Sequence, residues 1–284
     1  MLEIIYSISA STIIFILFRV FGRLNLDVFQ AVVFNYFSAF LCGYIFFYSD
    51  LQGDWEIENW WYYSLILGAL FISIFNLMGR SSNSNGIGLT SIATKISLLI
   101  SIIFTILFYK EGFTILKILG IIFAAISIVL ISFPKKGAKL KESGILIAIF
   151  LGSGLIEIVL SIANKSAIHS GISSVFTSVS FLSSGIIGLV VLGIMVATKS
   201  KKFCVKSMMA GIVLGIPNFF SIYFLVEALK KSNISTSSVF GIINISIVIL
   251  SFVIGILAFK EKPKLIHIIG VLAAILSLVL FMYV

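Results

Sequence analysis

The chain contains an internal repeat whose two copies lie 150 residues apart. Residues 106–130 and 256–280 are identical at 10 of 25 positions, and most other positions exchange one apolar residue for another. Each copy has a lysine–glutamate pair between two apolar segments and a glycine nine residues after the glutamate. These residues are Lys110, Glu111 and Gly120 in the first copy, and Lys260, Glu261 and Gly270 in the second. Because an internal repeat determines the architecture, the sequence predicts two copies of one half-chain.

The repeated glutamates and glycines have structural explanations. Glu111 and Glu261 fall where the next helix is expected to start. There, a carboxylate can accept hydrogen bonds from free N–H groups and face the positive end of the helix dipole. Gly120 and Gly270 fall inside that helix, where the lack of a side chain lets a neighbouring helix approach closely. We therefore favour helix capping and packing over direct contact with a substrate.

The composition is that of a polytopic membrane protein. Of the 284 residues, 60% are hydrophobic and 11% are charged, and the mean hydropathy is +1.20. A soluble domain of this size could not cover its core with so few polar residues. The net charge of +9 does not indicate nucleic-acid binding, because the basic residues lie in short turns between apolar runs.

Ten apolar runs of about 20 residues each predict an all-α fold with ten membrane-spanning helices. The runs are 2–18, 28–48, 60–79, 87–108, 113–133, 144–163, 175–197, 208–229, 239–259 and 265–284. The two five-helix halves are residues 1–134 and 143–284, joined by a basic linker. Since five is an odd number, the second half must enter the membrane from the opposite side. Inverted repeats of this kind are typical of secondary transporters that bind substrate at the midplane between the halves.

The distribution of lysine and arginine predicts the orientation in the membrane. The turns after helices 1, 3, 5, 7 and 9 hold 14 of the 20 basic residues. The turns after helices 2, 4, 6 and 8 hold 5, including Lys117, and Lys95 lies within a helix. The positive-inside rule then places the first set of turns in the cytoplasm and both termini outside. We expect a bacterial inner-membrane protein in contact with lipid, as a monomer or a homodimer.

With this arrangement the chain resembles the EamA-like members of the drug/metabolite transporter superfamily over essentially its whole length. The resemblance rests on the five-plus-five repeat, on Glu111 and Glu261 at equivalent turns, and on Gly120 and Gly270. It implies secondary transport, often export, of small metabolites such as amino acids or nucleobases. It also implies a cavity lined by helices 1–4 and 6–9, with helices 5 and 10 as a scaffold. Many members keep both termini in the cytoplasm, whereas the charge distribution here argues for the reverse.

Ionisable and polar side chains inside the predicted helices are the candidates for substrate binding. A charge within a membrane helix is costly and usually marks a transport pathway, which singles out Lys95 in helix 4 and Glu157 in helix 6. We expect Lys95 to attract an anionic group and Glu157 to bind a cationic group or a coupling proton. A permanent structural ion pair between them is the alternative. The uncharged candidates are Asn35 and Tyr36 in helix 2, Asn76 in helix 3, Asn218 after Pro217 in helix 8, and Asn244 in helix 9. Hydrogen bonding between helices would explain each of these as well.

One further buried acid, Glu227, has a simpler explanation. Lys230 and Lys231 follow it by three and four residues, which favours an ion pair at the end of a helix. The two cysteines form no CxxC motif and the two histidines lack metal-ligand spacing, so we expect no metal and no cofactor.

The sequence favours a transporter over three other classes of membrane protein. An intramembrane enzyme would need a catalytic pair or a histidine-rich metal site, and the sequence shows neither pattern. A structural or receptor-like protein would show no solute-specific flux, and a channel would not saturate at low turnover. We therefore expect a non-enzymatic transporter that moves a small polar metabolite by alternating access. Its substrate, coupling ion and direction of transport stay open.

The predicted orientation can be tested by labelling in intact cells that carry a variant without native cysteines. We predict that a cysteine introduced at Ser200 is protected from a membrane-impermeant thiol reagent, because the basic turn that contains it is expected in the cytoplasm. A cysteine at Gln52, in an acidic turn, is expected to be labelled. The opposite pattern of labelling would overturn the orientation.

Overall fold

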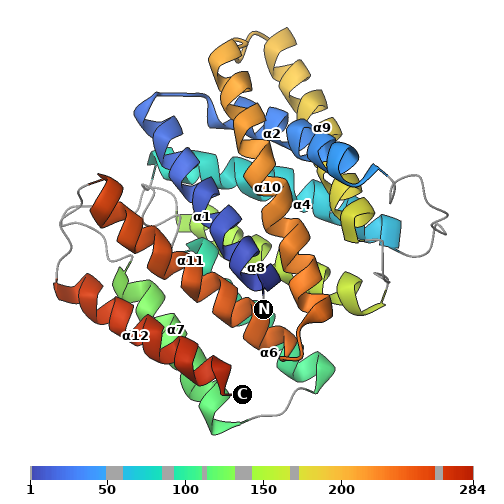
Figure 1. Cartoon of the computed structure of the whole chain (residues 1–284). Coiled ribbons are helices and arrows are strands. Elements are labelled where there is room, and N and C mark those ends of the chain that lie inside the picture. The colour runs from blue at the N-terminus through green and yellow to red at the C-terminus, as the bar shows by residue number, and fades with distance from the viewer. Residues whose placement is uncertain are drawn as a thin grey trace.

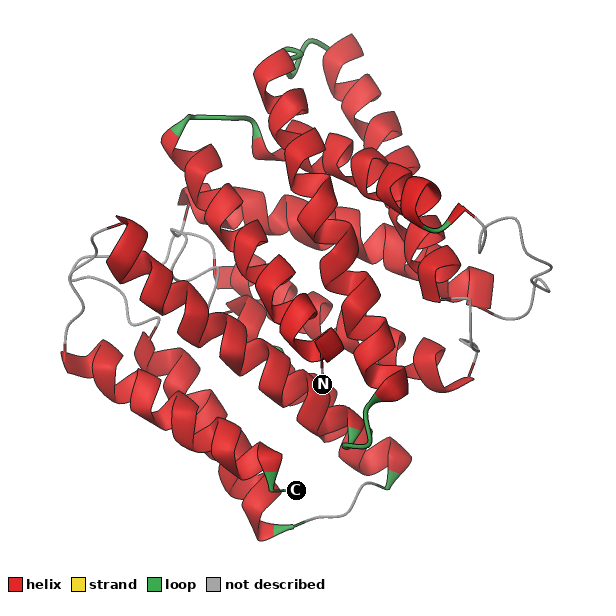
Figure 2. Ribbon diagram, in the orientation of Figure 1, coloured by secondary structure: helices red, strands yellow, loops and turns green. Residues whose placement is uncertain are grey.

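A computed structural model describes residues 2–48, 60–84, 93–110, 114–131, 143–166, 173–259 and 265–283 (Figure 1). Among these residues, ten longer helices account for most of the structure and there is no β-strand (Figure 2). The helices are α1 (Leu2–Arg23), α2 (Val28–Phe46), α4 (Trp60–Ser84), α6 (Leu98–Tyr109), α7 (Ile115–Ile131), α8 (Ser143–Ser166), α9 (Ser173–Ala197), α10 (Val205–Lys231), α11 (Thr236–Phe259) and α12 (Leu265–Met282). The all-helical class predicted from the sequence is confirmed.

Seven of the described helices are long and apolar enough to cross a membrane, namely α1, α2, α4, α8, α9, α10 and α11. Their apolar spans are 19 to 27 residues long, and about 20 residues are needed to cross the hydrocarbon core. Shorter apolar helical stretches are Ala93–Tyr109, Ile115–Ser127 and Ile268–Phe281. The structure therefore has several helices that could span a membrane, and the prediction of ten spans stays a prediction.

Three details differ from the sequence prediction. Helix 4 is expected to be continuous, but the helical residues that begin at Ala93 are interrupted at Ser97, before α6. Predicted helix 3 corresponds to α4, which continues past the apolar run through polar residues to Ser84. Lys117 is counted in a turn, but it lies in α7, where the hydroxyl oxygen of Thr114 accepts a hydrogen bond from its N–H and so begins the helix.

Two other predictions concern the repeated glutamates and glycines. Glu111 and Glu261 lie outside the described residues, so their capping role stays a prediction. Gly120 faces α12: a Cβ at this position would lie 3.5 Å from atoms of Leu280 and Phe281, which is an ordinary van der Waals distance. The Ser277 hydroxyl also donates a hydrogen bond to the Gly120 carbonyl oxygen, at 2.7 Å. The predicted role of Gly120 in close packing stays a prediction, because a Cβ there would make only ordinary van der Waals contacts. Its counterpart Gly270 is buried in α12.

The helices form one bundle with a peripheral pair. The interface between α2 and α10 is the most extensive, α10 also packs on α1, and α9 packs on both α2 and α4. Helix α8 contacts α4 and α6, and α11 contacts α1 and α6. Helices α7 and α12 pair with each other at one edge of the bundle (Figure 1), and α11 is the main neighbour of both. The central helices are therefore those that can surround a site.

One close contact between α2 and α10 recurs between α4 and α9. A Cβ on Gly215 of α10 would lie 2.4 Å from the Cβ of Ser38 in α2. A Cβ on Gly68 of α4 would lie 2.5 Å from the Cβ of Ser183 in α9. In both places, a glycine on one helix faces a serine on the other, so the two backbones approach closely.

A second pair of reciprocal contacts crosses the interface between α2 and α9. Gly43 of α2 faces Ser178 of α9, where an added Cβ would lie 1.9 Å from the serine Oγ. Gly188 of α9 faces Val33 of α2, at 2.9 Å from its Cγ2. The same offset of 145 residues relates Gly43 to Gly188 and Val33 to Ser178, and it also relates Ser38 to Ser183. These contacts therefore place α2 and α9 in a common register.

Helices α1 and α10 pack along each other, and their ends define two faces of the bundle. At one face, which we call the Asp27 face, the turn between α1 and α2 meets the turn between α9 and α10 through an ion pair of Asp27 and Lys201. The N-terminal face lies at the other end of α1, a length of about 33 Å at ~1.5 Å per residue. There Glu3 interacts electrostatically with Lys231 at the end of α10. Both turns at the Asp27 face belong to the basic set of turns predicted from the sequence.

We predict that Gly211→Ala destabilises the protein, because the added Cβ would lie 2.1 Å from the carbonyl oxygen of Ala31 and would force α2 and α10 apart. Overpacking of this kind costs roughly 1–3 kcal/mol. The matched control is Gly193→Ala in α9, where an added Cβ meets nothing within 4 Å. It is expected to be neutral or stabilising, since glycine inside a helix costs about 0.5–1 kcal/mol relative to alanine. Thermal unfolding midpoints of the purified proteins measure both, and equal midpoints would contradict the close packing.

Candidate functional site

Three of the residues singled out in the sequence form one hydrogen-bonded network. The ammonium group of Lys95 donates to the side-chain oxygen of Asn244, with 3.1 Å between Nζ and Oδ1. The amide nitrogen of Asn244 donates to Glu157, with 2.9 Å between Nδ2 and Oε1. Lys95 and Asn244 are each 8% exposed, and Glu157 is half-buried. The lysine and the glutamate are thus joined through one asparagine amide.

Two further side chains complete the surroundings of the network. The Ser101 hydroxyl of α6 donates to the second carboxylate oxygen of Glu157. The Lys95 ammonium lies 5.0 Å from the centre of the Phe15 ring of α1, a cation–π distance. The network therefore draws on α1, the residues before and within α6, α8 and α11. Sequence reasoning missed Ser101 because the chain is rich in serine, and missed Phe15 because aromatic residues are common throughout.

Small residues and an irregular helix position these side chains. A Cβ on Gly154 of α8 would lie 2.8 Å from the Cβ of Ile100, so α6 and α8 approach closely at this level. Glu157 follows Gly154 by three residues and so lies on the same face of α8. Near Lys95, the Ser97 hydroxyl donates to the carbonyl oxygen of Thr94, and the Ser97 carbonyl accepts from the N–H of Ile100. That bond between residues three apart is of the 3₁₀ type and marks an irregular stretch.

Asn35 and Asn218 form a separate contact between α2 and α10. The amide nitrogen of Asn218 donates to the side-chain oxygen of Asn35, with 3.1 Å between Nδ2 and Oδ1, and both residues are almost fully buried. Helix α10 continues through Pro217, the residue before Asn218. This geometry is the hydrogen bonding between helices that the sequence left open as the alternative to substrate binding.

The remaining two candidates, Tyr36 and Asn76, lie apart from both groups. The Tyr36 ring is fully buried, stacked on Phe181 of α9 and edge-on to Phe75 of α4. Its hydroxyl has no hydrogen-bond partner among the described residues. Asn76 lies half-buried on α4 and makes no side-chain hydrogen bond within the described part of the chain. The structure thus brings together three of the seven predicted site residues and pairs two others.

Two other charged residues have structural roles. Glu227 forms the predicted helix-end ion pair with Lys231, at 2.6 Å, which confirms that interpretation. Lys117 is 2% exposed and donates to the Ser235 hydroxyl at 3.2 Å, linking the beginnings of α7 and α11. Lys117 is the buried charge that sequence reasoning missed. The threonine three residues before it was the available signal of a helix start.

The fold and the site define a class: an all-helical protein whose apolar helices could span a membrane and surround a buried polar network. No family model matches the chain. An uncharacterized protein of Haemophilus influenzae is 27% identical over 291 residues, covering 99% of this chain and 97% of that protein. A solved crystal structure superposes with a TM-score of 0.76 at 12% identity, over 99% of this chain and 98% of that chain. This similarity shows the fold alone.

We predict that Asn244→Leu lowers the stability of the protein, because it removes the amide that satisfies both Lys95 and Glu157. A buried polar group left without a partner costs about 1–3 kcal/mol. If Asn244 acts by joining the two, adding Lys95→Met to Asn244→Leu will cost less than the sum of the single changes. Unfolding midpoints of the two single variants and the double variant measure this coupling. Strict additivity would contradict the network.

Proposed function

We propose that the protein is a secondary transporter of the EamA-like type, which moves a small polar metabolite across the bacterial inner membrane by alternating access. The observation that carries the proposal is the network of Lys95, Asn244 and Glu157. It joins side chains from the two halves of the chain inside an apolar bundle. Ionisable groups in such surroundings are costly, and their usual explanation is a transport pathway.

Reciprocal helix contacts support an arrangement of two inverted five-helix repeats. If α2 corresponds to α9 and α4 to α10, a two-fold axis between the halves exchanges the α2–α10 interface with the α4–α9 interface. The paired contacts of Gly215 with Ser38 and of Gly68 with Ser183 have this form. The register differs by only two residues between the helix pairs, 145 for α2 and α9 and 147 for α4 and α10. Inverted repeats of this kind build transporters whose two halves rock around a central site.

The network lies where such an axis would pass. In the 150-residue register of the sequence repeat, Asn244 corresponds to Thr94, the residue beside Lys95. The hydrogen bond between Lys95 and Asn244 therefore connects nearly equivalent positions of the two halves. Helices α6 and α11 are also in contact with each other. The irregular backbone at Ser97 is also typical of transporter sites, where a broken helix is tolerated next to a cavity.

The chemistry of the network supports a substrate that carries both an anionic and a cationic group. The Asn244 amide presents an acceptor to Lys95 and a donor to Glu157. An α-amino acid presents the same pattern more strongly, with a carboxylate for Lys95 and an ammonium for Glu157. An amino acid that entered the site would replace the asparagine contacts with charge-assisted hydrogen bonds. The alternative role of Glu157 is to bind a coupling proton.

The proposed orientation follows the distribution of basic residues. The turns at the Asp27 face belong to the set with 14 lysines and arginines, so we place this face in the cytoplasm and both termini outside. The resemblance implies export as the direction of transport. The protein would then take its substrate from the cytoplasm and release it at the N-terminal face.

The test is transport by purified protein in proteoliposomes. A thermal-stability screen against amino acids and nucleobases identifies a ligand, because a compound that binds only the folded protein raises its apparent stability. Saturable uptake of that ligand is then measured for the native protein and two variants. We predict that Lys95→Ala and Glu157→Gln each abolish saturable uptake, whereas the folded protein remains in the membrane.

The matched controls are Glu227→Gln and Lys231→Ala, which remove a helix-end ion pair away from the network and should retain uptake. Normal saturable uptake by both Lys95→Ala and Glu157→Gln would exclude the network from the mechanism. The absence of solute-specific flux in the native protein, with every compound that stabilises it, would favour a structural or receptor-like membrane protein.

A further inference from the structure

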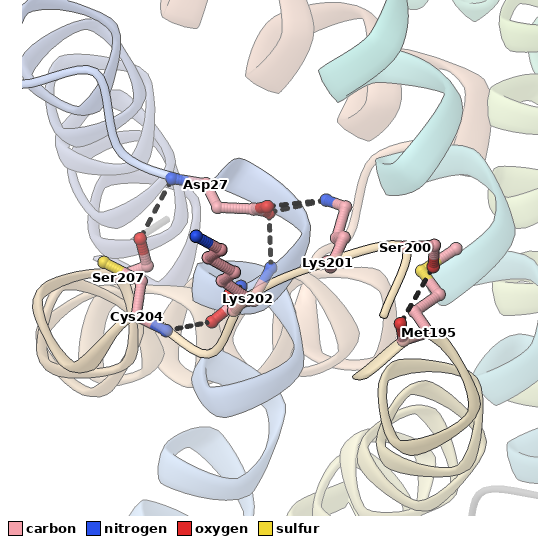
Figure 3. Close-up of polar contacts among 8 residues, drawn as sticks. Asp27, Met195, Ser200, Lys201, Lys202, Cys204 and Ser207 are labelled. Atoms are coloured by element: carbon pink, nitrogen blue, oxygen red, sulfur yellow. Dashed lines mark hydrogen bonds and ion pairs between the residues drawn. The ribbon is translucent and has the colours of Figure 1, made fainter. Parts of the chain in front are cut away.

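Two turns that belong to different halves of the chain are joined at the Asp27 face (Figure 3). The carboxylate of Asp27, at the start of α2, forms an ion pair with Lys201, with 2.6 Å and 2.9 Å from its two oxygens to Nζ. The Lys201 ammonium also lies 5.3 Å from the centre of the Phe29 ring. Lys201 and Asp27 are 32% and 27% exposed, so this part of the contact is reached by water.

Gln30 adds a buried bridge to the same pair of turns. Its amide nitrogen donates to the carbonyl oxygen of Lys202 at 2.6 Å, and its amide oxygen accepts from the N–H of Cys204 at 2.9 Å. The N–H of Asp27 donates to the Ser207 hydroxyl at 2.9 Å (Figure 3). Gln30 is only 1% exposed, and its two hydrogen bonds reach partly exposed backbone groups of the opposite turn.

The turns themselves have defined ends. Helix α1 ends with Asn25 in the left-handed conformation, and the N–H of Leu26 donates to the carbonyl oxygen of Phe21. Helix α9 ends with Lys199 in the same conformation, and the N–H of Ser200 donates to the carbonyl oxygen of Met195. Both are Schellman-type helix ends, which fix the direction in which the chain leaves the helix. Asp27 and Lys201 are therefore presented to each other from ordered turns.

The other half of the chain has apolar residues at the positions that correspond to Asp27 and Gln30. The common register of α2 and α9, which relates Ser38 to Ser183, assigns Ile172 to the position of Asp27 and Val175 to that of Gln30. Isoleucine cannot form an ion pair, and valine cannot bridge two backbone groups. The residues at these two positions therefore cannot make the side-chain contacts that Asp27 and Gln30 make.

We propose that Asp27, Gln30 and Lys201 form a latch that holds the Asp27 face closed and that must release for this face to open. The inference rests on the proposed transport cycle, in which the two faces open in turn. A partly exposed ion pair adds little stability in water, so the latch can open on thermal motion. The two hydrogen bonds from the buried Gln30 side chain to the opposite turn supply most of the latch's selectivity for the closed state. The latch biases the resting protein toward a conformation that opens at the N-terminal face.

The latch can be tested by measuring a distance across it. Spin labels are placed at Leu24 and Thr198, which are both exposed beside the two turns. Native cysteines are removed as Cys42→Ala and Cys204→Ser. The hydrogen bond with the Ser207 side chain lowers the pKa of the Cys204 thiol, which would favour its labelling. Double electron–electron resonance in liposomes then reports the distribution of distances between the labels.

The native protein is expected to show one short distance. Asp27→Asn keeps a side chain that caps α2 but removes the charge, and should raise the ratio of long to short distances by up to about fivefold. Gln30→Leu removes both hydrogen bonds between the two turns and should raise this ratio further. The control is Lys202→Gln, which removes a positive charge at the residue after Lys201, where only the backbone carbonyl contributes to the latch. It should leave the distribution unchanged.

Unchanged distances in both Asp27→Asn and Gln30→Leu would overturn the latch, and so would an equal shift in Lys202→Gln. The distance measurement needs no substrate, so it separates this inference from the proposed function. Saturable flux of the native protein together with unshifted distances in the variants would support the proposed transport function and contradict the latch. Shifted distances in the variants of a protein that shows no flux would support the latch and contradict the proposed transport function.

Discussion

The structure depends on one constraint, which is that polar groups inside an apolar bundle must find their partners within the protein. Asn244 shows how this is met at the centre of the molecule. Its amide has one acceptor and two donors, and it uses them for Lys95, for Glu157 and for the Phe240 carbonyl of its own helix. Four serines of α9 meet the same constraint by donating to the carbonyl oxygen of the residue four positions earlier, namely Ser178, Ser180, Ser183 and Ser184. Side chains that bond across helices therefore stand out as candidates for function.

Close packing follows from the same surroundings. In a lipid bilayer, apolar side chains gain little by leaving lipid for protein, so helices associate through small residues that let their backbones approach. Gly211, Gly215 and Gly68 have no room for a Cβ, and each faces backbone or a small side chain of the neighbouring helix. Glycine on α8 also brings Glu157 to Ser101. The packing that holds the bundle together is thus what sets the distances in the polar network.

Much of the fold could be predicted from the sequence, but less of the site. The apolar runs predicted the helices. They also made Lys95 and Glu157 recognisable as site candidates, because a charged residue in a long apolar segment can be seen in the sequence alone. Depth along a helix could not show that Asn244 lies between Lys95 and Glu157, since helix neighbours depend on packing between distant segments. The same limit hid Ser101, Gln30 and the bond of Asn35 with Asn218. Lys117 was missed because a charge near a helix end was assigned to the turn, although Thr114 begins the helix before it.

The internal repeat has a consequence for how such a molecule would move. If the two halves were identical and inverted, the conformation closed at one face and that closed at the other would have equal free energies. The residues that differ between the halves must then set any preference. In the register of α2 and α9, Gln30 with two bonds to the opposite turn corresponds to Val175 with none available to its side chain. The shared glycine and serine contacts would thus provide a symmetric scaffold, and a few polar side chains at one face would decide which conformation the protein adopts at rest.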